Sequence, residues 1–160
     1  SNSRVWSIFE EKKRTQEKWN VPIIVGEWGG FCEGDRWLDH LDFLLGKFDE
    51  NQWSQTYYTF FDSFFKTDYD KVLKRLVRPV PQAVCGNIEK YRYDKEKNVF
   101  TLEFTQERDF DVPTVIYAHK EIESIETDGE YTIVPLGKNG ESRIELKTKP
   151  GAHKVTVKLK

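Results

Sequence analysis

The side chains that could perform chemistry in this sequence are one glutamate and a few aromatic residues at the ends of two apolar segments. Glu27 and Trp28 close the run VPIIVGEW, and Tyr57 and Tyr58 follow about 30 residues later in the run WSQTYYTFF. A carboxylate in an apolar strand costs free energy, so a glutamate here either serves a site or pairs with a buried Arg or Lys. The residues alone leave both interpretations open. Trp28, likewise, either lines the site or packs beneath the helix that follows.

A carboxylate among aromatic side chains is typical of a carbohydrate site. Flat rings stack on the C–H faces of sugars, and a glutamate can attack an anomeric carbon. Retaining glycosidases need two carboxyl groups about 5 Å apart, one as nucleophile and one as acid and base. Glu27 is a candidate for the first of these roles.

The segments around Glu27 alternate between helical and strand patterns. Apolar spacing predicts an amphipathic helix from about Val5 to before Pro22, a strand over 21–28, a helix over 35–48 with Asp35 as its N-cap, a strand over 53–61 and a closing helix over 69–76. The first strand is apolar almost throughout, which favours a parallel strand covered on both faces. This order is the rhythm of a parallel α/β fold, and of a (β/α)8 barrel in particular.

In such a barrel, residues at the carboxyl ends of the strands face the active-site mouth. Glu27 is at such an end, and Tyr57 and Tyr58 are at the corresponding place one βα unit later. Two strands cannot close a barrel, so the remaining strands must come from absent sequence or from another chain.

The second half of the sequence consists of short alternating segments. Seven strands are predicted, over 88–93, 99–105, 114–119, 122–126, 131–135, 143–147 and 154–159. Phe100, Leu102 and Phe104 alternate as the inner face of a sheet does. The prediction is therefore an α/β plus all-β chain: residues 1–80 form the C-terminal part of a (β/α)8 TIM barrel, and residues 81–160 form a small antiparallel β-sandwich domain.

Composition excludes several classes of partner. The 160-residue chain has 25 basic and 27 acidic residues, a formal net charge of −2 and no basic patch, so we expect no nucleic-acid partner. No apolar run approaches the ~20 residues that a transmembrane segment needs. His119, His153 and the cysteines Cys32 and Cys85 lack the spacing of metal ligands, and we predict neither a metal nor a cofactor.

Several stretches carry a resemblance to a known family. The run VPIIVGEWGGF resembles the strand-seven nucleophile segment of family 5 glycoside hydrolases, and Thr56-Tyr57-Tyr58 resembles the strand-eight segment. The stretches RPVPQAV, FTLEF and PTVIY are similar to the connection and C-terminal sandwich of endoglycoceramidase-like members. The resemblance covers nearly the whole chain.

The resemblance implies a retaining hydrolase of β-glycosides, of glycosphingolipids or β-glucans, with Glu27 as nucleophile. Tyr58, with Trp28 and Tyr57, is implied to contact the sugar, although the family usually has Trp at the place of Tyr58. The family's acid/base lies in an Asn-Glu pair, and this chain contains no Asn-Glu dipeptide. The chain alone is therefore expected to be inactive. Its expected partners are the rest of the barrel and a carbohydrate or glycolipid substrate, and its expected location is secreted or extracellular.

An alternative from another class is that the β-sandwich is an autonomous module that binds carbohydrate or a lipid surface, next to a non-catalytic remnant. Tyr91, Tyr93 and Tyr131 are the candidate exposed aromatic residues for that role. A third interpretation treats the sandwich as structural, because the connection over 78–87 is short enough to favour tight docking.

Overall fold

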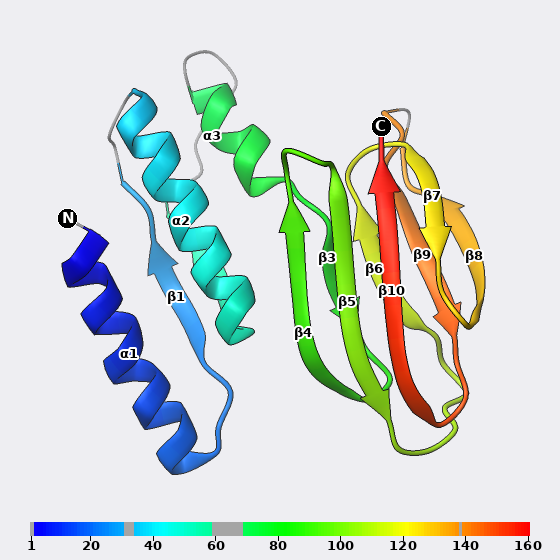
Figure 1. Cartoon of the computed structure of the whole chain (residues 1–160). Helices are drawn as coiled ribbons and strands as arrows, with labels where there is room; N and C mark the ends of the chain where they lie inside the picture. The colour runs from blue at the N-terminus through cyan, green and yellow to red at the C-terminus, as the bar shows by residue number, and fades with distance from the viewer. Residues whose placement is uncertain (1, 31–33, 59–68, 138) are drawn as a thin grey trace. The chain divides into compact units, whose positions relative to one another are not determined.

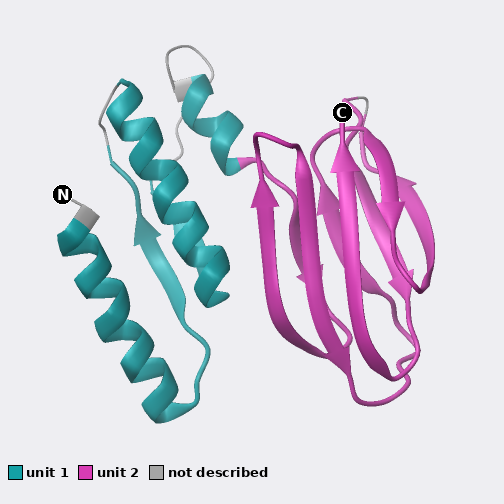
Figure 2. Ribbon diagram, viewed as in Figure 1, with its two compact units in different colours: residues 1–76 teal, residues 77–160 magenta. Residues whose placement is uncertain are grey.

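The computed structural model describes residues 2–30, 34–58, 69–137 and 139–160. The chain divides into two units, Ser1–Leu76 and Val77–Lys160 (Figure 2). The break lies a few residues before the predicted boundary between 80 and 81. The reason is that β3 (Val80–Ala83) pairs with β6 (Thr114–Ala118) and so belongs to the second unit.

The first unit alternates helices and strands in the predicted order (Figure 1). Its elements are α1 (Asn2–Trp19), β1 (Ile24–Trp28), α2 (Asp35–Asn51), β2 (Ser54–Tyr57) and α3 (Tyr69–Leu76). β1 and β2 pair in parallel. The predicted α/β order and parallel pairing are therefore confirmed, with strands shorter than expected. Residues 59–61 of the second predicted strand lie outside the described residues.

The apolar stripe of α2 packs as the sequence predicts, but the start of the helix does not. Leu38, Leu41, Leu45 and Phe48 are buried along the stripe. The N-cap is Gly34, at φ 93°, and no side chain caps the first turn. The prediction of Asp35 as N-cap is therefore wrong, because the glycine makes the turn into the helix and Asp35 is already helical. The Asp35 carboxylate still lies in the first turn, where the helix dipole favours negative charge.

Trp53, between α2 and β2, anchors α1 to the rest of the unit. Its ring stacks on Phe9 of α1 with centroids 5.0 Å apart and planes 6° apart. Its Nε1 donates a 2.7 Å hydrogen bond to Oε1 of Gln16. Phe48 of α2 joins the same buried cluster, and Val25 and Trp28 of β1 pack against it. One face of β1 is therefore covered by helices.

Of the two faces of β1 that are predicted to be covered, the described residues cover one. Ile24 is 73% exposed, and Gly26 and Glu27 are exposed as well. α1 and α2 cover the face of Val25 and Trp28, and the described residues leave the opposite face open. An apolar run alone does not reveal which chain supplies the second covering layer.

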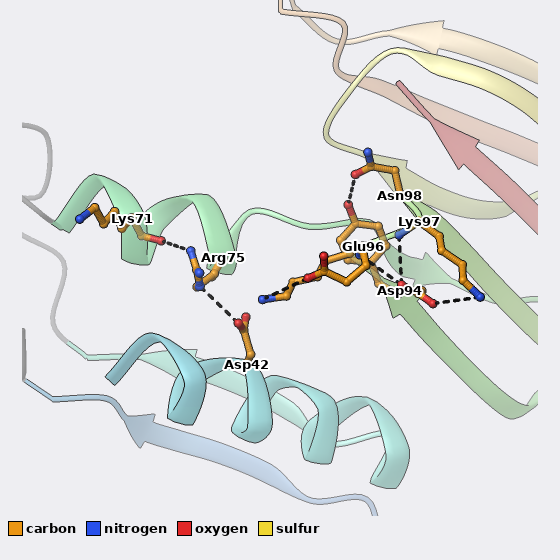
Figure 3. A network of polar contacts seen from close by, with 9 residues as sticks. Asp42, Lys71, Arg75, Asp94, Glu96, Lys97 and Asn98 are labelled. Carbon is orange, nitrogen blue, oxygen red and sulfur yellow. Dashed lines mark hydrogen bonds and ion pairs between the residues drawn. The ribbon is translucent and has the colours of Figure 1, made fainter. Parts of the chain in front are cut away.

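An ion pair ties α3 to α2. Arg75 Nε donates to Oδ2 of Asp42 at 3.3 Å, and Arg75 also donates to the carbonyl of Lys71 within its own helix (Figure 3). Val72 of α3 is buried against Leu41 and Leu45 of α2. α3 therefore closes the first unit through both apolar and charged contacts.

The second unit is a β-sandwich of two four-stranded antiparallel sheets, as predicted (Figure 1). One sheet has the order β4-β5-β10-β7, and the other has the order β3-β6-β9-β8. Besides β3 and β6, the strands are β4 (Asn87–Asp94), β5 (Val99–Gln106), β7 (Ile122–Glu126), β8 (Glu130–Pro135), β9 (Ser142–Lys147) and β10 (Gly151–Leu159). Phe100, Leu102 and Phe104 are almost fully buried in its core.

The turn between β4 and β5 is built by an aspartate. Asp94 Oδ1 accepts hydrogen bonds from the amides of Glu96 and Lys97 at 3.1 and 3.2 Å (Figure 3). Tyr93 Oη donates to Oδ1 of Asn98 at 3.0 Å, which closes the turn. These contacts explain why a wholly polar segment forms the predicted hairpin.

The described residues of the second unit form eight strands, one more than predicted. The extra strand is β3, which contains Pro81 and bulges between Pro81 and Ala83. Proline cannot donate to a ladder, so it is tolerated only at an edge or a bulge. β3 is at the edge of its sheet, where a proline is tolerated. The prolines of this segment therefore did not exclude a strand.

Candidate active site

Glu27 lies at a β-bulge in β1. The regular pairs on either side of the bulge are Val25 with Gln55 and Trp28 with Tyr57. Gly26 and Glu27 of β1 therefore stand opposite the single residue Thr56 of β2. A bulge of this kind turns two consecutive side-chain positions to the same side of the strand.

The bulge decides which way Glu27 faces. Strict alternation from Val25 would place Glu27 on the same face as Val25, toward the helices. Instead Gly26 and Glu27 are both exposed, and Trp28 returns to the half-buried side. The extra residue therefore moves the carboxylate to the face that no helix covers. We call this the open face of the strand pair, and we call the other the helix face.

Tyr58 lies on the same open face as Glu27. Along β2 the side chains alternate, with Thr56 exposed and Tyr57 half-buried, and Tyr58, which follows directly, is 55% exposed. The amide of Tyr58 donates a 2.7 Å hydrogen bond to the carbonyl of Trp28, so the parallel pairing continues past the end of β2. Because the strands are parallel, Glu27 and Tyr58 both lie at the carboxyl end of the pair.

Trp28 and Tyr57 lie on the helix face. The Trp28 ring meets Phe48 of α2 edge-on at 4.9 Å and Tyr57 edge-on at 5.1 Å. Trp28 Nε1 also donates a hydrogen bond to Oε1 of Gln55. These contacts favour the interpretation in which Trp28 packs beneath the helix. Of the four residues predicted from the sequence, the fold therefore brings Glu27 and Tyr58 together on one face and turns the other two away.

The carboxylate of Glu27 has no ion pair or hydrogen bond among the described residues. The alternative of a structural glutamate paired with a buried Arg or Lys therefore finds no partner in the described part of the chain. β1 and β2 hold no second carboxylate, since their sequences are IVGEW and SQTY. The strand pair thus supplies one exposed carboxylate, and a two-carboxyl mechanism needs the other from elsewhere.

Neither the bulge nor the role of the glycines around Glu27 was predicted from the sequence. Gly29 has φ 145°, and a Cβ on it would overlap the carbonyl oxygen of Tyr58. A glycine inside an apolar strand pattern is the signal that could have indicated a bulge or a close backbone approach. The sequence GEWG contains two such glycines, Gly26 and Gly29.

The two histidines of the second unit differ in their surroundings. His153 Nδ1 lies 2.9 and 3.0 Å from the two carboxylate oxygens of Asp128, and its Nε2 lies 2.6 Å from the carbonyl of Lys149. Burial, and then the charges of Lys120 and Arg78, lower the pKa of His119 from 6.5 to about 4. No group of three or more His, Cys, Asp or Glu side chains that could hold a metal ion occurs in the described ranges.

The tyrosines proposed as exposed aromatics of a binding module are mostly directed inward. Tyr91 and Tyr93 of β4 are partly buried against the sandwich core, and burial raises the pKa of both phenols. Tyr131 is 45% exposed. The expectation that Tyr91 and Tyr93 are exposed is therefore wrong, because β4 turns these alternate positions to the inside of the sheet. Of the helices that the structure describes, none is long and apolar enough to cross a membrane.

Solved structures of glycosidases share this fold. The lactosyl–enzyme intermediate of endo-glycoceramidase II from Rhodococcus sp. matches with a TM-score of 0.75 and 19% identity, over 99% of this chain and 38% of that chain. The complex of the same enzyme with ganglioside GM3 matches with a TM-score of 0.66 and 19% identity, over 88% of this chain and 32% of that one. Sterylglucosidase 1 from Cryptococcus neoformans matches with a TM-score of 0.61 and 14% identity, over 88% of this chain and 29% of that chain.

The chain spans 29 to 38% of the length of these three matched structures. The comparison with curated protein sequences finds no match. The model of the glycoside hydrolase family 5 C-terminal domain matches residues 78–158, which are β3 to β10 with their turns. The predicted resemblance is thus confirmed, and the chain belongs to the glycoside hydrolase family 5 C-terminal domain family.

Proposed function

We propose that the chain contributes the nucleophile Glu27 and the sugar-contacting residue Tyr58 to a retaining β-glycosidase. The other barrel strands and the acid/base are supplied by residues outside this chain. The observation that carries the proposal is that Glu27 and Tyr58 share the open face at the carboxyl end of a parallel strand pair whose other face is covered by helices. The carboxyl ends of the strands are where (β/α)8 barrel enzymes bind their substrates.

The proposed reaction follows from an exposed carboxylate without an ion-pair partner among the described residues. A Glu27 carboxylate oxygen attacks the anomeric carbon and forms a glycosyl ester, while the outside acid protonates the departing oxygen. Water, deprotonated by the same outside group, then attacks the anomeric carbon, and the bond to Glu27 breaks. The sugar leaves with its original anomeric configuration, because it is inverted twice.

We propose a β-glycoside as the substrate, with glycosphingolipids, whose aglycone is apolar, as the first class to test and β-glucans as the second. The support is the likeness to endo-glycoceramidase II and sterylglucosidase 1, whose names refer to lipid-linked sugars. At 19% and 14% identity this likeness concerns the fold, so the substrate class rests on experiment.

The test uses the complete barrel, formed by this chain with the polypeptide that supplies its remaining strands. Glu27→Gln removes the nucleophile while keeping the side-chain volume, and we expect turnover of nitrophenyl β-lactoside to fall about 10⁴-fold or more, as losses of essential catalytic groups do. Glu17→Gln, on the exposed part of α1, is the matched control and keeps full activity. Azide should restore turnover to Glu27→Ala and give a glycosyl azide of inverted configuration. Normal activity of Glu27→Gln rejects the proposal.

An assay of the isolated chain tests whether activity needs the polypeptide that supplies the remaining barrel strands. We expect the isolated chain to fold and to hydrolyse neither nitrophenyl β-lactoside nor glycolipid micelles, because β1 and β2 provide only one carboxylate. Hydrolysis by the isolated chain that Glu27→Gln abolishes would mean that a second catalytic group lies within these residues.

For the second unit, we propose a structural role rather than a sugar-binding one. The support is the inward packing of Tyr91 and Tyr93, which leaves Tyr131 as the one exposed candidate of the three. Calorimetric titration of the chain with lactose and with glycolipid micelles tests this. Heat of binding at millimolar lactose that Tyr131→Ser removes would support the binding module instead.

A further inference from the structure

The backbone of Gly29 touches the end of β2 more closely than any other residue type allows. Gly29 follows β1 directly and has φ 145°, a conformation that L side chains rarely adopt. A Cβ at this position would lie well under 3.0 Å from the carbonyl oxygen of Tyr58 and 3.2 Å from the Tyr57 ring. Contacts below 3.0 Å essentially never occur for real Cβ atoms, so any side chain here must displace the backbone of Tyr58.

Two hydrogen bonds hold the same contact from either side. The Tyr58 amide donates to the Trp28 carbonyl at 2.7 Å, just before Gly29. The Tyr57 hydroxyl donates to the Gly30 carbonyl at 3.3 Å, just after it. Gly29, which is two residues after Glu27, is therefore held against the backbone of Tyr58.

We propose that Gly29 is a positioning residue that sets the spacing between the Glu27 carboxylate and the Tyr58 ring; this inference rests on the function proposed above. The backbone at Gly29 is the short link between the two strand ends, and its missing side chain lets the ends approach. A displacement of about 1 Å in groups that orient a substrate can change its reaction rate by about 100-fold. In this role the glycine acts through the position of Tyr58, which binds the sugar in the proposed function.

The chain offers a closely matched control for this glycine. Gly86, in the second unit, has φ 150°, and a Cβ there would likewise overlap a backbone carbonyl oxygen, that of Thr105. Gly86→Ala therefore imposes the same type of strain and the same type of clash, but among the strands of the sandwich. Gly46, exposed on α2 with no atom within 4 Å of its Cβ position, provides the neutral control.

The kinetic test compares Gly29→Ala, Gly86→Ala and Gly46→Ala in the complete barrel with nitrophenyl β-lactoside. We expect Gly29→Ala to raise KM about tenfold, because a misplaced Tyr58 loses binding energy in the ground state and the transition state alike, and to leave the pH profile of kcat unchanged. Gly86→Ala should lower the melting temperature and keep KM. If Gly29→Ala keeps the wild-type KM, or changes only the fraction of active enzyme as Gly86→Ala does, the positioning role is refuted.

A structural readout on the 160-residue chain keeps the inference testable where Gly29→Ala folds poorly. Tyr57→Phe removes the hydrogen bond to Gly30 without adding an atom, and we expect exchange of the Tyr58 amide hydrogen to become faster in this variant than in Gly46→Ala. Unchanged exchange in Tyr57→Phe refutes the claim that the hydrogen bond from Tyr57 to Gly30 helps to hold the Gly29 contact, on which the inference rests. The outcomes separate the two proposals: full activity of Glu27→Gln overturns the proposed function, whereas loss of activity in Glu27→Gln with a normal KM for Gly29→Ala overturns the role of Gly29 alone.

Discussion

Glu27 and Tyr58 occupy the same face of the β1–β2 pair because β1 contains one residue more than β2 between matched pairs. Without this bulge the carboxylate would point toward α1 and α2, where Trp28 and Tyr57 pack. The hypothesis that Glu27 is catalytic therefore depends on the bulge, which places the carboxylate on the open face, and not on regular strand alternation.

The packing role of Trp28 predicts a loss of stability when its indole is shortened. Trp28→Phe leaves Oε1 of Gln55 without its donor and opens space beside Phe48. We expect the free energy of unfolding of the first unit to fall by about 1–2 kcal/mol, as is usual for lost packing and one unpaired polar group. Urea unfolding followed by helical circular dichroism measures it.

Trp19→Phe is the control for that experiment, because Trp19 is 67% exposed at the end of α1. Its effect should stay within about 0.5 kcal/mol. Equal stability of Trp28→Phe and wild type, together with weaker binding of nitrophenyl β-lactoside to the complete barrel, would favour the sugar-lining interpretation of Trp28.

The Arg75–Asp42 ion pair predicts a measurable coupling between α3 and α2. Both side chains are less than a third exposed, so solvent screens the pair less than it screens a surface pair. A double-mutant cycle with Arg75→Met and Asp42→Asn should give a coupling of about 1 kcal/mol. The ion pair of Lys74 and Asp70 within α3 provides the comparison, because its side chains are 72 and 55% exposed. We expect a coupling of about 0.3–0.5 kcal/mol for this pair. A larger coupling for the exposed pair would contradict this ranking.

His119 predicts a pH dependence of the stability of the second unit. Its pKa is about 4 when folded and 6.5 when unfolded, so between these values the unfolded chain binds the proton and the folded chain does not. The stability contribution is therefore complete above pH 6.5 and is lost as the pH falls toward 4. We expect the melting temperature to drop from pH 7 to pH 5, and His119→Phe to reduce that drop. An identical drop in His119→Phe would show that other groups cause it.

Much of this architecture follows from sequence patterns that act locally. The apolar run before Glu27, the stripe of α2 and the alternation of Phe100, Leu102 and Phe104 each specify an element by themselves. The parallel pairing also follows, since a helix separates the two strands.

The features that the sequence did not reveal depend on partners in space. The bulge at Glu27 exists only relative to Thr56, and β3 is a strand only because β6 accepts an edge strand that contains Pro81. The open face of β1 was predicted to be covered, because an apolar run records that burial is favourable but not what provides it. The sequence also did not decide whether Trp28 lines the site or packs beneath the helix, because the bulge determines the face on which Trp28 lies.

Covalent trapping tests the central claim most directly. The complete barrel is incubated with a fluorosugar analogue of lactose that carries a good leaving group, so that the glycosyl ester forms but is hydrolysed slowly, and the digested protein is sequenced by mass spectrometry. We expect one sugar on the peptide that contains VGEWGG, attached to Glu27, and no labelling of Glu27→Gln. A label on another carboxylate, or full turnover with no labelled enzyme, would contradict it.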